Sequence, residues 1–207
     1  MVDTGEKEEC VAEQYLILHG WENHRPAGHW QRWLAGELES RGAVVRYPQL
    51  PEPDMPVLEH WIDALESELR ATDPASLTVI AHSLGCLLWL AYAARRGSGG
   101  VAGAGGPVAR RIVLVAPPAG NVVRGIPEIA AFAPTLDCAA AATALAAIAS
   151  ERGLVVAGTN DPFCPEGAEH AYARPLDLDF VPVEGGGHLT IDDGYGPFPL
   201  VLELALR

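Results

Sequence analysis

The stretch Leu77–Cys86 constrains the fold more than any other part of the chain. Its first residues, Leu77–Ala81, form an apolar run rich in β-branched side chains, which is typical of a buried strand. Ser83 follows, and the apolar run 86–94 then begins at once, as expected for a helix. A strand that passes through a serine-tipped turn into a helix is the layout of a nucleophile elbow.

The residues around Ser83 are small enough for such a turn, in which strand and helix backbones crowd together. Gly85 has no side chain, and Ala81 replaces the usual first glycine with one extra methyl group. A serine hydroxyl is a poor nucleophile, so it has to be exposed beside a base. A serine after a strand also occurs as an ordinary turn or helix-capping residue. Partner residues elsewhere in the chain therefore decide between the two interpretations.

Two further strands are followed by candidate partners. The run Leu154–Gly158 ends shortly before Asp161, and the run Asp179–Val183 leads through three glycines to His188. The order Ser83, Asp161, His188 along the chain is that of α/β-hydrolases. Each candidate follows a predicted strand, at the sheet edge where open α/β folds build their sites. We therefore predict that these three residues form a catalytic triad.

The chemistry of such a triad assigns a role to each group. The histidine is predicted to take the proton of the serine hydroxyl, and the aspartate to orient the imidazole and stabilise its charged form. The tetrahedral intermediate then needs N–H donors for its oxyanion. One predicted donor is the backbone N–H of Leu84, directly after the nucleophile. The other is the backbone N–H of Trp21, after the first strand, or that of Glu22 if the turn is longer.

Several of these residues also fit a purely structural role. Asp161 precedes a proline, as a helix cap often does. His188 fits an ordinary loop histidine, although the preceding glycines indicate an unusual backbone path. His82, beside the nucleophile, is interpreted as structural or pocket-lining. The rival acids, none of which directly follows a convincing strand, are Asp137, Asp192 and Asp193.

Charge and ligand spacing argue against several function classes. The net charge of −13 argues against nucleic acid or an anionic membrane surface as a partner. No Cys/His spacing supports zinc, because His19, His24 and His29 recur every five residues, which aligns on neither a helix nor a strand. We therefore expect no metal, no cofactor and a small-molecule acyl substrate. The sequence does not determine the oligomeric state.

Length and composition predict one domain in a reducing compartment. A chain of 207 residues that is 49% hydrophobic can bury one sizeable core, which we expect over residues 14–207. Residues 1–13 carry five acids and one lysine and are expected to form a disordered tail. The four cysteines lack the spacing of a disulfide framework, and no membrane span or signal peptide is recognisable. These features predict a cytoplasmic protein.

Strands and helices alternate along the chain, which predicts a three-layer αβα sandwich around a mostly parallel sheet of about six strands. Apolar residues at helical spacing predict helices over 30–41 and 58–69, with their tryptophans in the core, and further helices over 139–150 and 199–207. The expected strands are Tyr15–His19, Ala43–Tyr47, Leu77–Ala81, Ile112–Ala116, Leu154–Gly158 and Asp179–Val183.

Three connecting segments carry their own expectations. The stretch Pro48–Pro56 contains four prolines and is expected to be a stiff loop at the active edge of the sheet. The glycine-rich stretch Gly97–Ala109 is expected to be a mobile connector away from the site. The segment Pro117–Leu136 is expected to overhang the nucleophile, and it is too short for a large lid. An open site that takes short acyl groups follows from this length.

Several motifs together resemble a known family. They include His29-Trp30-Gln31, the elbow at Ser83, Asn160-Asp161-Pro162 and Gly187-His188-Leu189. Their combination, over roughly residues 16–198, resembles the small serine hydrolases related to retinoblastoma-binding protein 9. The resemblance implies a compact α/β-hydrolase fold without a large lid, a Ser-Asp-His triad on the residues named above, and esterase-like activity on small activated esters. Ala81, the helix over 139–150 and the glycine connector depart from the family pattern.

The sequence therefore predicts a serine hydrolase that cleaves small carboxylic esters through an acyl-enzyme on Ser83. Thioesterases and amidases or peptidases use the same triad, so these reactions stay open as alternatives. A further alternative is a binding module with an idle site, since one fold serves many functions. Reaction of the serine with an active-site phosphonate distinguishes an active from an idle site.

Overall fold

Six parallel strands form one sheet, in the order β2-β1-β3-β4-β5-β6. The computed structural model describes residues 12–97, 106–135 and 137–207. Its elements follow the chain as β1 (Gln14–Leu18), α1 (Trp30–Ser40), β2 (Val44–Arg46), α2 (Leu58–Leu69), β3 (Leu77–His82), α3 (Leu84–Gly97), β4 (Arg111–Val115), α4 (Gly120–Arg124), η1 (Ala130–Phe132), α5 (Cys138–Ile148), β5 (Leu154–Gly158), η2 (Glu169–Ala173), β6 (Asp179–Val183) and α6 (Pro199–Ala205).

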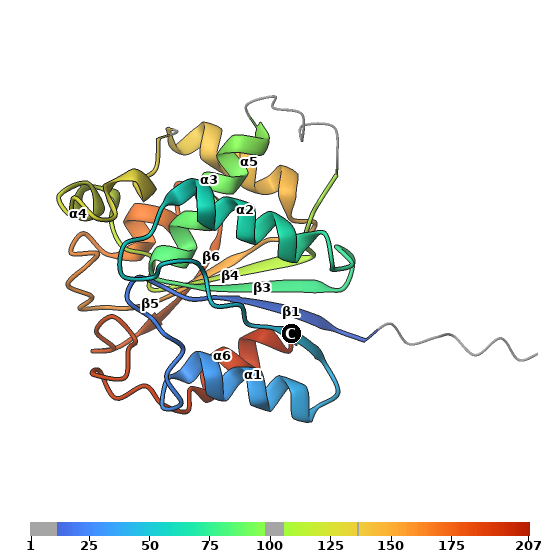
Figure 1. Cartoon of the computed structure of the whole chain (residues 1–207). Coiled ribbons are helices and arrows are strands. Elements are labelled where there is room, and N and C mark those ends of the chain that lie inside the picture. Colours follow the sequence, from blue (N-terminus) through green and yellow to red (C-terminus); the bar gives the residue numbers. More distant parts are fainter. Residues whose placement is uncertain (1–11, 98–105, 136) are drawn as a thin grey trace, which may run out of the picture.

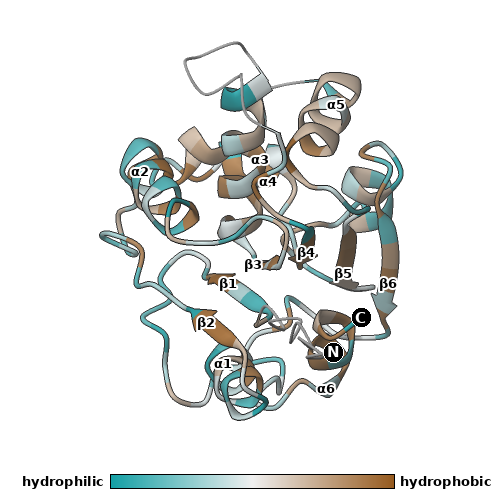
Figure 2. Cartoon of the chain, turned by 90° about the vertical axis from the view of Figure 1, so that its right-hand side faces the viewer, coloured by the Kyte–Doolittle hydropathy of each residue, from teal (hydrophilic) through white to brown (hydrophobic). Residues whose placement is uncertain are grey.

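Helices cover both faces of this sheet. Figure 1 shows α2, α3 and α5 on one face and α1 with α6 on the other. The three-layer αβα sandwich predicted from the alternation of strands and helices is therefore confirmed. Hydrophobic strands lie between the two helical layers (Figure 2), because a parallel sheet covered on both faces is shielded from water on both.

The predicted strands agree closely with the observed ones. β5 and β6 have the predicted bounds, and the ends of β1, β3 and β4 differ by one residue. β2 is shorter than predicted, spanning Val44–Arg46 rather than Ala43–Tyr47, because it is an edge strand that pairs only with the start of β1. The last helix ends at Ala205 instead of Arg207. One element that the sequence did not indicate is η2, a short π-helix over Glu169–Ala173.

Some sequence expectations lie outside the described part of the chain. Residues 1–11 of the predicted tail and residues 98–105 of the predicted connector are among them. Within the described ranges, none of the helices combines the length and apolar character needed to cross a membrane.

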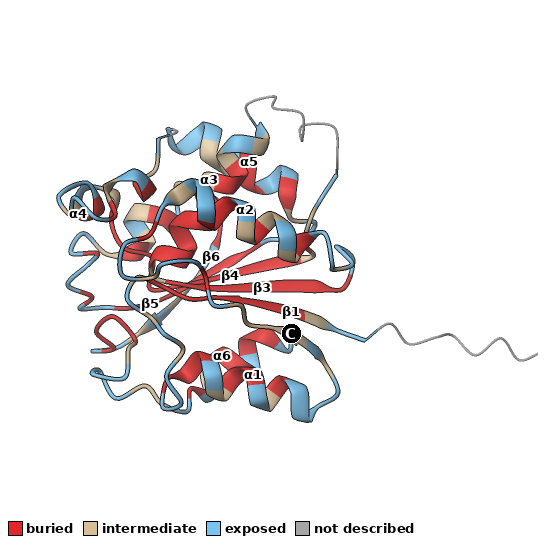
Figure 3. Cartoon of the chain, in the orientation of Figure 1, coloured by how far each residue is buried: buried red, intermediate tan, exposed pale blue. Residues whose placement is uncertain are grey.

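Tryptophan side chains anchor the core on both faces of the sheet. Trp61 and Trp89 are fully buried in the cluster beneath α2 and α3, and Trp30 is fully buried in the cluster beneath α1 and α6. Figure 3 shows that the central strands β1, β3, β4 and β5 and the inner sides of the helices are buried, whereas the edge strands β2 and β6 are half-buried or exposed. Trp30 and Trp61 are core residues, as predicted, whereas Trp33, also predicted for the core, is half-buried against the cluster beneath α1 and α6. Large apolar side chains of this kind each contribute about 2 kcal/mol or more to folding.

The order of the strands opens a crevice at one edge of the sheet. β1 and β3 are neighbours, but the helix after β1 lies on one face and the helix after β3 on the other. The chains leaving the carboxyl ends of these two strands therefore diverge, which is where open α/β folds bind ligands. Gly20 follows β1 and Ser83 follows β3 at this point.

Gly85 allows α3 to begin directly against the end of β1. A Cβ atom at this position would lie 2.7 Å from the His19 carbonyl oxygen and 2.9 Å from that of Leu18. Both neighbours are backbone atoms, which can move only if the strand itself moves. This close approach confirms the expectation that the turn requires a small residue at position 85.

We predict opposite effects for two glycine-to-alanine substitutions. Gly85→Ala forces the helix away from β1, so the free energy of unfolding should fall by about 2–3 kcal/mol. Gly36→Ala places its methyl group in open space inside helix α1, so stability should rise by about 0.5–1 kcal/mol. Urea unfolding monitored by circular dichroism measures both. An unchanged stability for Gly85→Ala would contradict the packing described above.

Candidate active site

Ser83 stands on a strained turn between β3 and α3. Its φ angle is +51°, in the left-handed region that residues with a side chain seldom occupy. The Ser83 N–H donates to the Val115 carbonyl oxygen at 2.9 Å, and the Ser83 carbonyl accepts from the Cys86 N–H at 2.9 Å. Such strain costs on the order of 1–3 kcal/mol and persists only where the surroundings maintain it.

His188 lies between Ser83 and Asp161. Its Nε2 atom is 2.8 Å from Ser83 Oγ, and its Nδ1 atom is 2.8 Å from Asp161 Oδ2. Asp161 and His188 are 4% and 8% exposed, so both partners are largely shielded from water. The other carboxylate oxygen of Asp161 accepts the Phe163 N–H at 2.8 Å. The structure thus brings together the three residues singled out in the sequence, from the ends of β3, β5 and β6.

Asp193 and Asn160 hold the loop that carries His188. Asp193 Oδ2 accepts the backbone N–H groups of His188 and Thr190 and the Thr190 hydroxyl. Asn160 Oδ1 accepts the Gly187 N–H at 2.8 Å. Gly187 has a φ of +58°, and a Cβ there would overlap the Asp193 carboxylate, so only glycine leaves room for this anchor.

The rival acids of the sequence do not contact the imidazole. Asp193 binds the histidine loop through its backbone, and Asp137 caps α5 by accepting the Ala140 N–H. Asp192 is exposed at the surface of the same loop. Asp161 is the acid beside the His188 ring.

His82 supports the loop that carries His188. Its Nε2 atom donates to the His188 carbonyl oxygen at 3.1 Å, and its ring lies 5.4–5.5 Å from the rings of His29, Trp30 and His188. Burial holds the pKa of His82 well below its usual value, so the ring is neutral. The interpretation of His82 as structural or pocket-lining agrees with this position, since it also borders the cavity.

The motif His29-Trp30-Gln31 connects the loops around the serine. The Trp30 indole N–H donates to the Leu189 carbonyl oxygen at 2.9 Å, and Gln31 Nε2 donates to the Leu18 carbonyl oxygen at 2.9 Å. His29 caps helix α1 by accepting the Gln31 N–H at Nδ1. Burial lowers the pKa of His29 to about 4. The motif therefore joins the histidine loop to the end of β1.

His19 fastens the loop after β1 to the proline-rich loop. Its Nδ1 donates to the Gly20 carbonyl oxygen at 2.8 Å, and its Nε2 accepts the Leu50 N–H at 2.8 Å. This pattern requires the neutral ring, and burial lowers the pKa of His19 to about 4. His24, in contrast, pairs with Asp54 on the surface at 2.8 Å. The three histidines of this region thus have three separate partners.

The backbone N–H groups of Trp21 and Leu84, both near Ser83, have no hydrogen-bond partner among the described residues. The N–H of Glu22, the alternative donor that the sequence leaves open, donates to the Pro53 carbonyl oxygen at 2.9 Å. A Cβ on Gly20 would lie 2.9 Å from Ser83 Cβ, so the loop after β1 passes directly over the serine. This geometry favours Trp21 over Glu22 as the second donor.

Ser83 opens into a cavity of about 740 Å³. The loop over 21–29 and the described part of the segment over 117–136 both contribute to its wall. The second of these supplies an apolar face formed by Val122, Val123, Ile126 and Ile129. Only α4 and η1 occur in the described part of this segment, so it forms a small cover rather than a large lid. A second cavity, of about 870 Å³, lies among α2, α3 and α5 and does not contain the serine.

Comparison with known proteins assigns this chain to a family. A protein-family model described as serine hydrolase matches residues 15–206. The chain belongs to the serine hydrolase family. YdeN of Bacillus subtilis, a protein named as a hydrolase, is 25% identical to this serine hydrolase over 198 residues, which cover 94% of this chain and 95% of YdeN.

Solved structures show the same fold. The crystal structure of YdeN has a TM-score of 0.76 at 23% identity and covers 94% of this serine hydrolase and 97% of its own chain. A YdeN-like hydrolase from Pectobacterium atrosepticum has a TM-score of 0.66 at 23% identity, and the match covers 94% of the present chain and 90% of the chain in that structure. A thioesterase domain from the curacin biosynthetic pathway has a TM-score of 0.63 at 16% identity, with 95% and 92% covered. The structure is a compact α/β-hydrolase fold.

The sequence alone did not indicate the anchoring roles of His82, Asn160 and Asp193. It marks Asp193 only as a rival acid, and it marks His82 as structural or pocket-lining without indicating that this residue binds the histidine loop. The three successive glycines before His188 indicate that the loop needs an external anchor, but no spacing rule identifies the residue that supplies it.

We predict that this serine hydrolase loses stability as the pH falls from 6.5 towards 4. In this range the unfolded chain protonates His19, His29 and His82 while the folded chain keeps them neutral, so the free energy of unfolding declines, and the contributions of His19 and His29 are fully lost below about pH 4. His19 and His29 should each account for about 2 kcal/mol at about pH 5.

Urea unfolding at about pH 7.5 and about pH 5 measures this loss. His19→Gln removes one titrating ring, so its loss between the two pH values should be about 2 kcal/mol smaller than that of the unmodified protein. Equal losses in both proteins would contradict the role of the neutral His19.

Proposed function

We propose that this protein cleaves small carboxylic esters through an acyl-enzyme on Ser83, with His188 as the base and Asp161 as the orienting acid. The observation that carries the proposal is the continuous line of two 2.8 Å contacts, from Ser83 Oγ through the imidazole to Asp161 Oδ2. This line ends at a serine that opens into a cavity large enough for a small ester.

Acylation begins with proton transfer at the serine end of this line. His188 Nε2 accepts the Ser83 proton while Oγ attacks the ester carbonyl carbon, and the proton then passes to the departing alcohol. Asp161 accepts the N–H at Nδ1, which presents Nε2 to the serine in its basic form and stabilises the imidazolium. Water then attacks the acyl-enzyme by the same route and releases the acid.

The two unpartnered N–H groups supply the oxyanion hole in this proposal. The backbone N–H of Leu84 begins helix α3, and that of Trp21 lies on the loop that crosses the serine. A pair of preorganised donors stabilises the negative charge on the carbonyl oxygen of the tetrahedral intermediate, and losing one such donor typically costs about a hundredfold or more in rate.

The apolar wall formed by Val122, Val123, Ile126 and Ile129 is proposed to receive the acyl group. The segment that carries it is short and leaves the cavity open, which supports short rather than long acyl chains. We further propose membership in the group related to retinoblastoma-binding protein 9. The bond from the Trp30 indole to the Leu189 carbonyl supports this grouping, because it joins two motifs on which the resemblance rests.

Partners and location are also proposals. A small-molecule acyl substrate fits a cavity that contains a serine–histidine pair. A cytoplasmic location is consistent with Cys86, Cys138 and Cys164, which are unpaired within the described part of the chain.

We predict that a fluorophosphonate labels the protein once and only through Ser83. Intact-mass spectrometry should show one adduct on the unmodified protein and none on Ser83→Ala or His188→Ala. Asp161→Asn should fold but react at least about a thousandfold more slowly, because the amide does not hold the imidazole in its basic tautomer. Absence of an adduct on the well-folded protein would favour the idle binding module over a hydrolase.

A panel of butyrate esters, thioesters and amides then separates the remaining alternatives. The proposal expects turnover of the ester without turnover of the amide, whose amine is a much poorer leaving group, and ready turnover of the amide would favour the amidase or peptidase alternative. Higher kcat/KM for a neutral thioester than for a matched ester would favour the thioesterase alternative.

A further inference from the structure

The rim of the cavity around Ser83 is acidic. Three carboxylates, those of Glu22, Asp192 and Asp193, border it on the loops after β1 and β6. Among the described residues that line the cavity there is no lysine or arginine. The remaining titratable groups there are histidines, of which His29 and His82 are buried and neutral at physiological pH.

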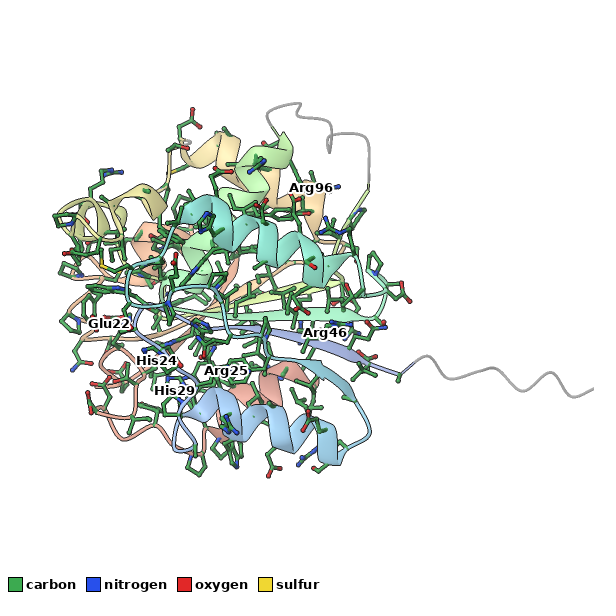
Figure 4. The ribbon with its side chains drawn as sticks, in the orientation of Figure 1. Glu22, His24, Arg25, His29, Arg46 and Arg96 are labelled. Carbon is green, nitrogen blue, oxygen red and sulfur yellow. The ribbon has the colours of Figure 1, made fainter. Side chains whose placement is uncertain are left out.

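The cations closest in sequence to the cavity point elsewhere. Arg25 follows the Glu22 turn, but its guanidinium donates to the Tyr47 carbonyl oxygen and to Gln49. In Figure 4, Glu22 lies at the edge of the molecule where the loops gather, while Arg25 lies on the side towards Arg46. Arg124 on α4 lines the second cavity rather than the one at the serine.

The acidic and apolar parts of the cavity come from different segments. The apolar wall belongs to the segment after β4, and the carboxylates belong to the loops that carry the proposed oxyanion donor and His188. In the proposed reaction the acyl group occupies the apolar wall, which leaves the alcohol to the other segments of the cavity, and these carry the acidic rim. All three carboxylates are exposed, but Asp193 Oδ2 accepts hydrogen bonds from the histidine loop, so Glu22 and Asp192 are the rim charges that can be replaced without disturbing that loop.

We propose that the site selects its substrates by the charge of the leaving group: it favours esters of cationic or neutral alcohols and disfavours acyl groups on polyanionic carriers. This inference rests on the proposed ester hydrolysis. For a separation of about 8 Å between a substrate cation and each of two carboxylates, Coulomb attraction in a water-like medium corresponds to a preference of about fivefold at low salt. A nucleotide-bearing thiol such as coenzyme A carries several negative charges and should be disfavoured by about tenfold or more.

Matched substrate pairs test this proposal. Butyrylcholine and 3,3-dimethylbutyl butyrate have the same shape and differ in one positive charge. Butyryl-coenzyme A and S-butyryl-N-acetylcysteamine share the thioester and differ in the phosphorylated nucleotide. The measurement is kcat/KM for both members of each pair, in the unmodified protein and in a Glu22→Gln/Asp192→Asn variant. Comparing the ratio within a pair between the two proteins removes the intrinsic reactivity of the substrates.

In the variant, the kcat/KM ratio of butyrylcholine to 3,3-dimethylbutyl butyrate should fall by about fivefold. The kcat/KM ratio of butyryl-coenzyme A to S-butyryl-N-acetylcysteamine should rise by about tenfold. About 0.5 M NaCl should abolish both differences between the variant and the unmodified protein. Glu39→Gln, at the end of α1 remote from His29, removes a charge away from the cavity and should leave both ratios unchanged. Ratios equal in all three proteins, with the neutral ester still hydrolysed, would overturn the charge selection alone. No turnover of either neutral substrate would overturn the proposed function as well.

Discussion

The left-handed backbone of Ser83 is the constraint on which the rest of the site depends. The turn projects the hydroxyl out of the sheet, and the helix that follows must begin against the carbonyl oxygens at the end of β1. Gly85 makes that approach possible, and the bond from the Ser83 N–H to Val115 holds the strained residue in place. The other groups of the candidate site are arranged around the hydroxyl of Ser83.

Around the serine the structure uses buried histidines as neutral hydrogen-bonding groups. His19, His29 and His82 each have a pKa lowered by burial, and each binds backbone atoms of a different segment. A neutral ring at His82 also avoids repulsion with the imidazolium that the proposed mechanism forms on His188, about 5.4 Å away between ring centres. Among these four histidines, His188 is the one with a buried carboxylate as its partner.

The cavity combines this rigid centre with less constrained surroundings. The apolar wall belongs to a short segment with one five-residue helix, α4, and the acidic rim belongs to exposed loop residues. In the proposed function the catalytic groups are held by buried hydrogen bonds, whereas substrate preference depends on residues whose replacement leaves those bonds intact. Such a division allows one fold to act on different esters.

Much of this protein could be predicted from local sequence patterns. Strand residues such as Leu154–Gly158 are apolar and bounded by turn residues, so their positions follow from local chemistry, and the order of Ser83, Asp161 and His188 along the chain is enough to identify the candidate triad. The roles of Asp193, Asn160 and His82 depend on hydrogen bonds between segments, and the length of β2 on its edge position.

The sequence by itself determined the alternation of strands and helices and the residue types at the strand ends, because periodicity and turn chemistry are local. The tertiary structure alone decided that Trp21 rather than Glu22 has an unpartnered N–H among the described residues, that Arg25 turns away from the cavity, and that the rim around Ser83 is acidic. These properties depend on contacts between residues that are far apart in the sequence, and no short-range sequence pattern specifies such contacts.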